Sequence, residues 1–247
     1  MARIDGRAPD ELRKIVITPD YLSHPLGSVL IQNGQTRVIT AASVEAKVPA
    51  WMKSQNLPGG WITCEYGMLP AATHSRTKRE STVGHQSGRT CEIQRLIGRS
   101  LRQSADLIKL GPNTVSLDCD VLDADGGTRC ASITGAAAAL AIACRRGAQS
   151  GLLPEDPFKE LVAAISVGII DGVPMLDLCY EEDSRAEVDM NVVMTESGNL
   201  IEVQGTAEGK PFSRAKLNEL LDLAEFGLKE IFTLQQQAII AASEVQK

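Results

Sequence analysis

The chain has 247 residues, of which 43% are hydrophobic, and a formal net charge of −6. This length and apolar content allow a sizeable core, whereas the acidic balance excludes a protein that is basic over its whole surface, as a bulk nucleic-acid binder would be. No linker-like or low-complexity segment divides the sequence, so we expect a single domain over residues 1–247.

The first part of the chain is typical of strands followed by a helix. Four β-rich segments are predicted, at residues 15–18, 28–31, 36–40 and 61–66. Asn33-Gly34 is a strong hairpin signal between the second and third of them. The polar segment 73–82 carries too many charges to pack in a core and predicts an exposed loop. From residue 88 to about 107 the apolar period becomes helical.

The second part repeats this order. Strands are predicted at residues 114–122, 161–170, 175–180, 189–194 and 200–204. Small residues at 130–144 predict one helix, and a second, amphipathic helix runs from the capping residue Ser213 to about residue 231. Strands in groups, each followed by helices, indicate a two-layer α+β fold and not a doubly wound sheet.

A turn at residues 123–129, Asp-Ala-Asp-Gly-Gly-Thr-Arg, lies between the predicted strand 114–122 and the helix 130–144. Gly126 and Gly127 can adopt positive φ and leave room for a ligand, while the first N–H groups of the helix have no partner within it. These donors and the forked guanidinium of Arg129 suit an oxyanion such as phosphate. The alternative is an ordinary Asp/Gly turn that only caps the helix.

Basic residues are concentrated between residues 74 and 102, where seven Lys and Arg stand against two Glu. Such a patch on an acidic protein attracts a polyanion locally. Arg76, Lys78 and Arg79 lie in the polar loop of this patch, and Arg95, Arg99 and Arg102 lie on its predicted helix.

Acidic residues gather between residues 181 and 189. Most acidic loops are merely solvated, but Asp189 opens an apolar strand, where a bare surface carboxylate has no obvious role. Carboxylates at the rims of two adjacent strands can converge on one Mg²⁺, which keeps waters and substrate phosphates as its other ligands. Such an ion would offset the repulsion between an attacking phosphate and a phosphodiester.

Several common sites are not expected. The six cysteines form no C-x-x-C pair and the three histidines have no metal-ligand spacing, so we expect free buried thiols and no zinc site. The chain also lacks the P-loop, dinucleotide-binding and G-x-S-x-G motifs. No apolar run reaches transmembrane length and no signal peptide is evident, so we expect a cytoplasmic protein without membrane contact.

Long stretches of the chain resemble the ribonuclease PH family of bacterial phosphorolytic 3′ to 5′ exoribonucleases, also called tRNA nucleotidyltransferases. The matching stretches are Arg3-Ile-Asp-Gly-Arg7, Gly60-Trp-Ile-Thr-Cys-Glu-Tyr-Gly-Met-Leu-Pro70, Gly88-Arg-Thr-Cys-Glu-Ile-Gln-Arg-Leu-Ile-Gly-Arg99, Leu122-Asp-Ala-Asp-Gly-Gly-Thr-Arg129 and Glu182-Asp-Ser-Arg-Ala-Glu-Val-Asp-Met-Asn191. The resemblance implies the fold of ribosomal protein S5 domain 2 and a ring-shaped homohexamer built as a trimer of dimers.

The resemblance also implies roles for single residues. The co-substrate, inorganic phosphate, would be bound by Arg89, Gly127, Thr128 and Arg129. Asp183 and Asp189 would be the essential acidic pair, holding a divalent ion such as Mg²⁺ or protonating the leaving oxygen. The loop residues Arg76, Lys78 and Arg79 would contact RNA phosphates, whereas Arg95, Arg99 and Arg102 have two interpretations, RNA binding or salt bridges between subunits. The implied reaction trims the 3′ ends of tRNA precursors, and of rRNA, with phosphate. It releases nucleoside diphosphates and is reversible.

Three other functions remain to be weighed. A small-molecule kinase would need a glycine-rich ATP loop, which the sequence lacks. A non-catalytic RNA-binding subunit of an exosome-like ring would be expected to have lost the arginine or the carboxylate pair, and both pairs are present here. A hydrolytic nuclease is the closest chemical alternative, because composition does not distinguish water from phosphate as the nucleophile.

Overall fold

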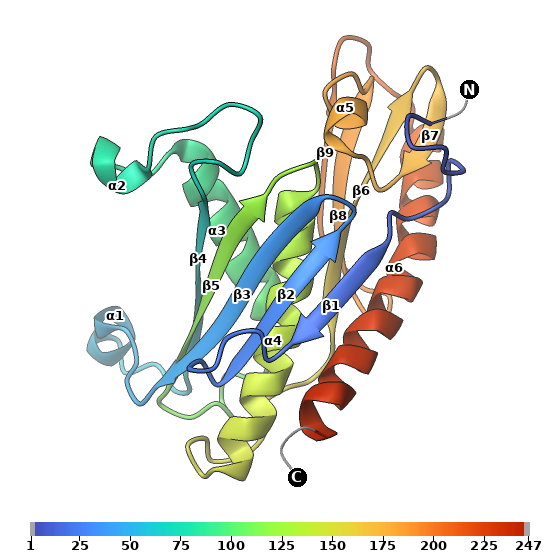
Figure 1. Ribbon diagram of the computed structural model, residues 1–247. Coiled ribbons are helices and arrows are strands. Elements are labelled where there is room, and N and C mark those ends of the chain that lie inside the picture. The colour runs from blue at the N-terminus through green and yellow to red at the C-terminus, as the bar shows by residue number, and fades with distance from the viewer. Residues whose placement is uncertain (1–2, 245–247) are drawn as a thin grey trace.

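The computed structural model describes residues 3–244, which form two β-sheets with helices packed between and beside them (Figure 1). The first sheet has the order β1 (Ile15–Pro19), β2 (Gly27–Asn33), β3 (Thr36–Glu45), β5 (Thr114–Asp123) and β4 (Trp61–Met68). The second has the order β7 (Val173–Leu176), β6 (Val162–Ile170), β8 (Val188–Thr195) and β9 (Leu200–Ala207). Neighbouring strands are antiparallel except β4 and β5, which are parallel.

The chain has three long helices, of which the last follows the final strand, and three short helices in the loops. The long helices are α3 (Gly88–Leu101), α4 (Thr128–Gln149) and α6 (Arg214–Glu244). The short ones are α1 (Ala50–Ser54), α2 (Glu80–Val83) and α5 (Tyr180–Asp183). The predicted cap of α6 is confirmed, since the Ser213 Oγ accepts a hydrogen bond from the Lys216 N–H at 3.2 Å.

Helix α4 is the centre of the core. It packs against β2 and β3 of the first sheet and against β6 of the second, and it also contacts α3 and α6. Its small side chains allow this, because most of the helix from Thr128 to Cys144 is buried on every face. One hydrophobic cluster therefore runs through both sheets, and the N-terminus of α4 lies where the two sheets meet.

The predicted α+β class is confirmed, but some element boundaries are wrong. The strand expected at residues 175–180 ends at Leu176, and residues 180–183 form α5 instead. The helix expected to reach residue 107 ends at Leu101, because the chain turns to pair Ala105 with Phe158. Both errors arise from long-range contacts, which local hydrophobic periodicity does not encode.

All six cysteines are free thiols. Cys64, Cys119, Cys130 and Cys144 are buried, whereas Cys91 is exposed, so the expectation of buried thiols holds for most of them and fails for Cys91. Within residues 3–244 no helix combines the length and the apolar character that a bilayer crossing requires.

Candidate active site

The glycine turn that follows β5 leads directly into α4. Gly126 and Gly127 have φ of 74° and 68°, in the left-handed region that favours glycine. Gly127 stands at the N-cap position, and no side chain of the described residues caps this helix end. The free backbone donors of the first helical turn are thus available to an anion, as the sequence predicts.

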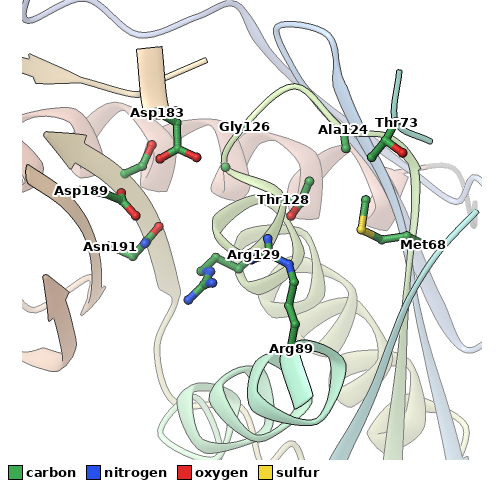
Figure 2. A pocket seen from close by; sticks show the side chains of 12 residues that line it. Met68, Thr73, Arg89, Ala124, Gly126, Thr128, Arg129, Asp183, Asp189 and Asn191 are labelled. Atoms are coloured by element: carbon green, nitrogen blue, oxygen red, sulfur yellow. The ribbon is translucent and has the colours of Figure 1, made fainter. Parts of the chain in front are cut away.

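A cavity of about 230 Å³ lies in front of this turn, between the two sheets (Figure 2). It is lined by residues from β4, α3, the turn, α4, β6, α5 and β8: Met68, Thr73, Arg89, Ala124, Gly126, Gly127, Thr128, Arg129, Ser166, Asp183, Asp189 and Asn191. Figure 2 shows the two arginines reaching toward the middle of the cavity and the two aspartates on its other side. The four residues proposed for phosphate and the acidic pair therefore share one site.

The two arginines come from the first turns of two helices. Arg89 is the second residue of α3 and Arg129 the second residue of α4. The Arg129 guanidinium donates a hydrogen bond to the Gln204 side-chain oxygen of β9, and its Nη1 lies 3.5 Å from Glu92 Oε1. Two guanidinium groups beside two helix N-termini make this wall of the cavity strongly attractive to an anion.

Thr128 is fixed from the side of the first sheet. The Tyr66 hydroxyl, on buried β4, donates to the Thr128 Oγ1 at 3.1 Å. No local pattern indicates a role for Tyr66 at this site, since an aromatic residue in an apolar strand is normally a core residue. Its contact with Thr128 becomes apparent only in three dimensions.

The acidic pair is formed by α5 and β8. Asp183 ends α5, whereas the sequence placed it in an acidic loop between two strands, and Asp189 is the second residue of β8. Burial, followed by the negative charge of Asp183, raises the pKa of Asp189 to about 6. Burial also raises the pKa of Asp183, although Arg89 and Arg129 oppose this effect. Two partly buried carboxylates so close together favour the binding of a proton or a cation.

The donor set fits the expected Mg²⁺, because this ion binds proteins through one or two carboxylates and keeps waters and phosphate oxygens as other ligands. Among residues 3–244 no cluster of three or more His, Cys, Asp and Glu side chains could hold a metal by itself. Asp183 and Asp189 are thus the residues that would hold a divalent ion, completed by substrate oxygens.

The predicted RNA contacts lie outside the cavity. Arg76, Lys78 and Arg79 are exposed on the loop that leads to α2, which projects away from the first sheet in Figure 1. This loop surrounds a shallow depression of its own and borders a groove that continues from Arg89. The loop is therefore placed to contact a ligand that extends beyond the cavity.

The helix arginines make contacts within the chain. Arg99 Nη1 lies 2.6 Å from Glu202 Oε2 on β9. Arg102 donates to the Ile62 carbonyl at 3.0 Å and stacks on the Trp61 ring, 4.5 Å from its centroid. Arg95 is exposed beside them.

Three lining residues, Thr73, Ser166 and Asn191, were not assigned to the site from the sequence. Ser166 on β6 and Asn191 on β8 are register partners, so the sheet places both on the face that carries Asp189. The alternation of polar and apolar residues in β8 already places Asn191 on that face, but it indicates no role for the residue. Ser166 stands alone in an apolar strand and gave no such signal.

A helix N-terminus with two arginines, facing an acidic pair in a cavity between two sheets, suits an enzyme that transfers phosphoryl or nucleotidyl groups. The chain belongs to the 3′ exoribonuclease family: the model of domain 1 of that family matches residues 11–145 and the model of domain 2 matches residues 160–226. Over 237 residues, 96% of each chain, it is 56% identical to the ribonuclease PH of Corynebacterium efficiens.

Solved structures agree in fold. Rice Rrp46 superposes with a TM-score of 0.77 at 21% identity, over 96% of this chain and all of that one. An archaeal exosome core gives a TM-score of 0.74 at 24% identity, covering 95% and 91% of the two chains. The Archaeoglobus fulgidus exosome, solved with RNA bound to its active site, gives 0.75 at 25% identity, covering 99% and 91%.

Proposed function

We propose that the chain is a phosphate-dependent 3′ to 5′ exoribonuclease that trims the 3′ ends of tRNA precursors, and of rRNA, in the cytoplasm. The observation that carries this proposal is the pairing of an anion-binding turn and two arginines with two carboxylates in one cavity. The 56% identity to a ribonuclease PH supports it. The solved exosome with RNA in its active site supports an RNA ligand for a site of this fold.

In the proposed reaction, inorganic phosphate binds on the side of the cavity formed by the two helix N-termini. Arg89, Arg129 and the backbone of Gly127 and Thr128 hold it there. One of its oxygens attacks the phosphorus of the last internucleotide bond. The bond from that phosphorus to the 3′ oxygen of the preceding nucleotide breaks. The products are a nucleoside diphosphate and an RNA shortened by one nucleotide, whose 3′ oxygen takes up a proton.

The protein contributes mainly position and charge, which is how phosphoryl transfer is generally accelerated. The arginines bring the anionic nucleophile close to an anionic phosphodiester. A divalent ion held by Asp183 and Asp189 would supply neutralising charge for the phosphate oxygens and the leaving oxygen. Because a diphosphate bond forms as a phosphodiester breaks, the reaction is expected to be reversible, and the same site would add nucleotides.

The test is incubation with Mg²⁺ and a tRNA bearing extra 3′ nucleotides, with and without inorganic phosphate. Nucleoside diphosphates released only with phosphate are the expected result. Nucleoside monophosphates released without phosphate would instead identify a hydrolytic nuclease. No release under either condition, with RNA still bound, would favour a non-catalytic ring subunit.

Two variants and one control connect the activity to the cavity. Arg129→Ala and Asp189→Ala are each expected to lower kcat/KM by about 10²-fold or more while the fold is retained. Arg145→Ala is the matched control, since this exposed arginine lies on the same helix as Arg129 but near its other end, where it donates to Ser243. Unimpaired phosphorolysis in either site variant would remove that residue from the proposed site.

We also propose a homohexameric ring, a trimer of dimers, as the functional assembly. The similarity to the archaeal exosome core supports an assembly of several such subunits. Light scattering at assay concentrations is expected to give the mass of six chains, and a monomer that retains full activity would contradict this proposal.

A further inference from the structure

The two halves of the cavity belong to segments that are distant in sequence but touch each other. A Cβ atom on Gly126 of the turn would lie 2.8 Å from the backbone of Cys179 and Tyr180, where α5 begins. The Tyr180 N–H donates to Asp125 Oδ1 at 3.2 Å. Because of these contacts, the glycine turn cannot move without moving α5, the helix that ends in Asp183.

One buried side chain bridges these halves. Arg13, only 6% exposed, donates from Nε and Nη2 to the two carboxylate oxygens of Asp177 at 3.0 and 2.6 Å. Its remaining Nη1 donates to the Asp125 carbonyl of the turn at 2.6 Å. A single planar guanidinium thus donates one hydrogen bond to the turn and two to Asp177, which precedes α5.

Asp177 is itself rigidly held. It has a φ of 53°, which costs energy for a residue other than glycine, and its side chain is 1% exposed. Asn33 Nδ2 and the Arg13 backbone N–H also donate to its carboxylate, both at 2.9 Å. Burial raises the pKa of Asp177, but the Arg13 charge and these hydrogen bonds outweigh it, so the carboxyl stays ionised. This residue directs the chain from β7 into α5.

We propose that Arg13 is a positioning residue for the reaction. It sets the distance between the glycine turn and Asp183 without touching the substrate. This inference rests on the proposed function. A lysine would keep the charge but not the fork, because an ammonium is a point charge that cannot span Asp177 and the Asp125 carbonyl in the same way. Small errors in such a separation are costly, since in-line attack needs the reacting groups in close alignment.

The experiment compares Arg13→Lys with Arg146→Lys in the full-length protein. Arg146 is a matched control because it also makes a forked pair, with Asp20 at 2.6 and 2.8 Å, and also donates to backbone carbonyls, those of Leu26 and Ala242. It lies near the C-terminal end of α4, away from the cavity. Each protein is assayed for thermal unfolding, calorimetric binding of inorganic phosphate without RNA, and phosphorolysis of tRNA.

Arg13→Lys is expected to weaken phosphate binding and to lower kcat at saturating phosphate, together reducing kcat/KM by about 10²-fold. Arg146→Lys breaks the same kind of forked pair at a more exposed position, so it should lose less thermal stability and keep both parameters near wild type. If Arg13→Lys retains wild-type phosphate affinity and kcat, the positioning role is wrong. A loss of activity that only follows the loss of stability, equally in both variants, also contradicts it.

Two further variants distinguish a loosened turn from a changed distance and replace Arg13→Lys if that variant does not fold. Thr36→Val removes the hydroxyl that accepts from the Asp125 N–H and donates to the Gly126 carbonyl, so it loosens only the turn. It should weaken phosphate binding and leave kcat at saturating phosphate unchanged, whereas Arg13→Lys should change both.

If Arg13→Lys does not fold, Arg13→Gln combined with Asp177→Asn leaves no lone buried charge and should show the same losses. Wild-type protein that binds phosphate without phosphorolysis would refute the proposed function separately.

Discussion

At the scale of single residues, the acidic pair shows how environment changes an ordinary side chain. Asp183 and Asp189 are six positions apart and were both identified in the sequence as candidates. Their mutual repulsion follows only from the way α5 folds back beside β8. The pKa of both groups is raised, which means that their ionised forms are destabilised in the folded protein. A bound cation or a proton removes this destabilisation.

Replacing Asp189 with Asn should therefore stabilise the metal-free protein at neutral pH while it abolishes activity. The folded-state pKa is raised from 3.8 to about 6, so the folded state binds the proton more tightly than the unfolded state. The resulting stabilisation is complete below pH 3.8 and is lost as the pH rises through about 6. The full rise corresponds to about 3 kcal/mol, which we reduce to about 1 to 2 kcal/mol because solvent reaches part of the group.

The measurement is urea unfolding in EDTA at several pH values from about 4 to about 7, comparing wild type with Asp189→Asn. The stability advantage of the variant should grow over this range. Asp222→Asn, at an exposed position of α6, serves as the control and should show a much smaller change. A stability difference for Asp189→Asn that does not vary with pH would contradict the raised pKa.

At the scale of elements, the loop before α3 is the segment that we propose to bind RNA outside the cavity. Arg76, Lys78 and Arg79 are exposed and lie outside the cavity. Their joint replacement by Ala should weaken tRNA binding and reduce the slope of log affinity against log salt by about 2 to 3, since each phosphate contact contributes about 0.7 to 0.9. The measurement is a binding titration at several salt concentrations.

The control for the loop removes three other exposed cations, Lys109, Arg145 and Lys159. It changes the net charge equally and should leave the salt slope nearly intact. Unchanged tRNA affinity and salt dependence in the loop variant would mean that the loop does not bind the RNA.

Packing of α4 against the first sheet depends on a glycine in β2. A Cβ on Gly27 would lie 2.3 Å from the Ala139 carbonyl oxygen and 2.8 Å from the Ala143 nitrogen, both backbone atoms that cannot move alone. Gly27→Ala should destabilise the protein by about 1 to 3 kcal/mol or more, because it overpacks this contact. Gly88→Ala is the control, since a Cβ there meets nothing within 4 Å. Denaturant unfolding of the two variants checks the prediction, and equal stability would refute the close approach of α4.

At the scale of the whole molecule, the two regions matched by the family models are not separate bodies. The gap between those regions, residues 146–159, spans the end of α4 and the loop before β6. The core cluster nevertheless continues from β2 and β3 through α4 into β6 and β8. One domain over residues 1–247 stays a prediction, and a core shared by both sheets is what that prediction expects.

Unfolding should therefore occur as one transition. Both tryptophans, Trp51 and Trp61, lie in the first half of the chain and pack edge to face, 5.0 Å apart, so their fluorescence reports on that half. Far-ultraviolet circular dichroism reports mainly on α4 and α6, the two longest helices. The two signals should coincide over the denaturant range at a fixed protein concentration. Separate midpoints would show that the halves unfold independently.

The sequence by itself determined the order of most strands and long helices, the anion-binding turn and the identities of its charged residues. These features are local: hydrophobic period, Asn-Gly and Gly-Gly turns, and a capping serine act within a few residues. Its errors arose from long-range contacts: the strand predicted through residue 180 ends at Leu176, and α5 begins at Tyr180, a helix of one turn held by the buried pair of Arg3 and Glu182. That pair spans 179 positions and leaves no local pattern.

Only the tertiary structure decided that Arg89, Arg129, Asp183 and Asp189 share one cavity and that the pKa of Asp189 rises to about 6. It also decided that Arg13, 112 positions from Asp125 and 164 from Asp177, connects the two halves of that cavity. The physical reason is the same in each case. Desolvation and electrostatic interaction depend on distance in space, and the packing of α4 against both sheets sets those distances.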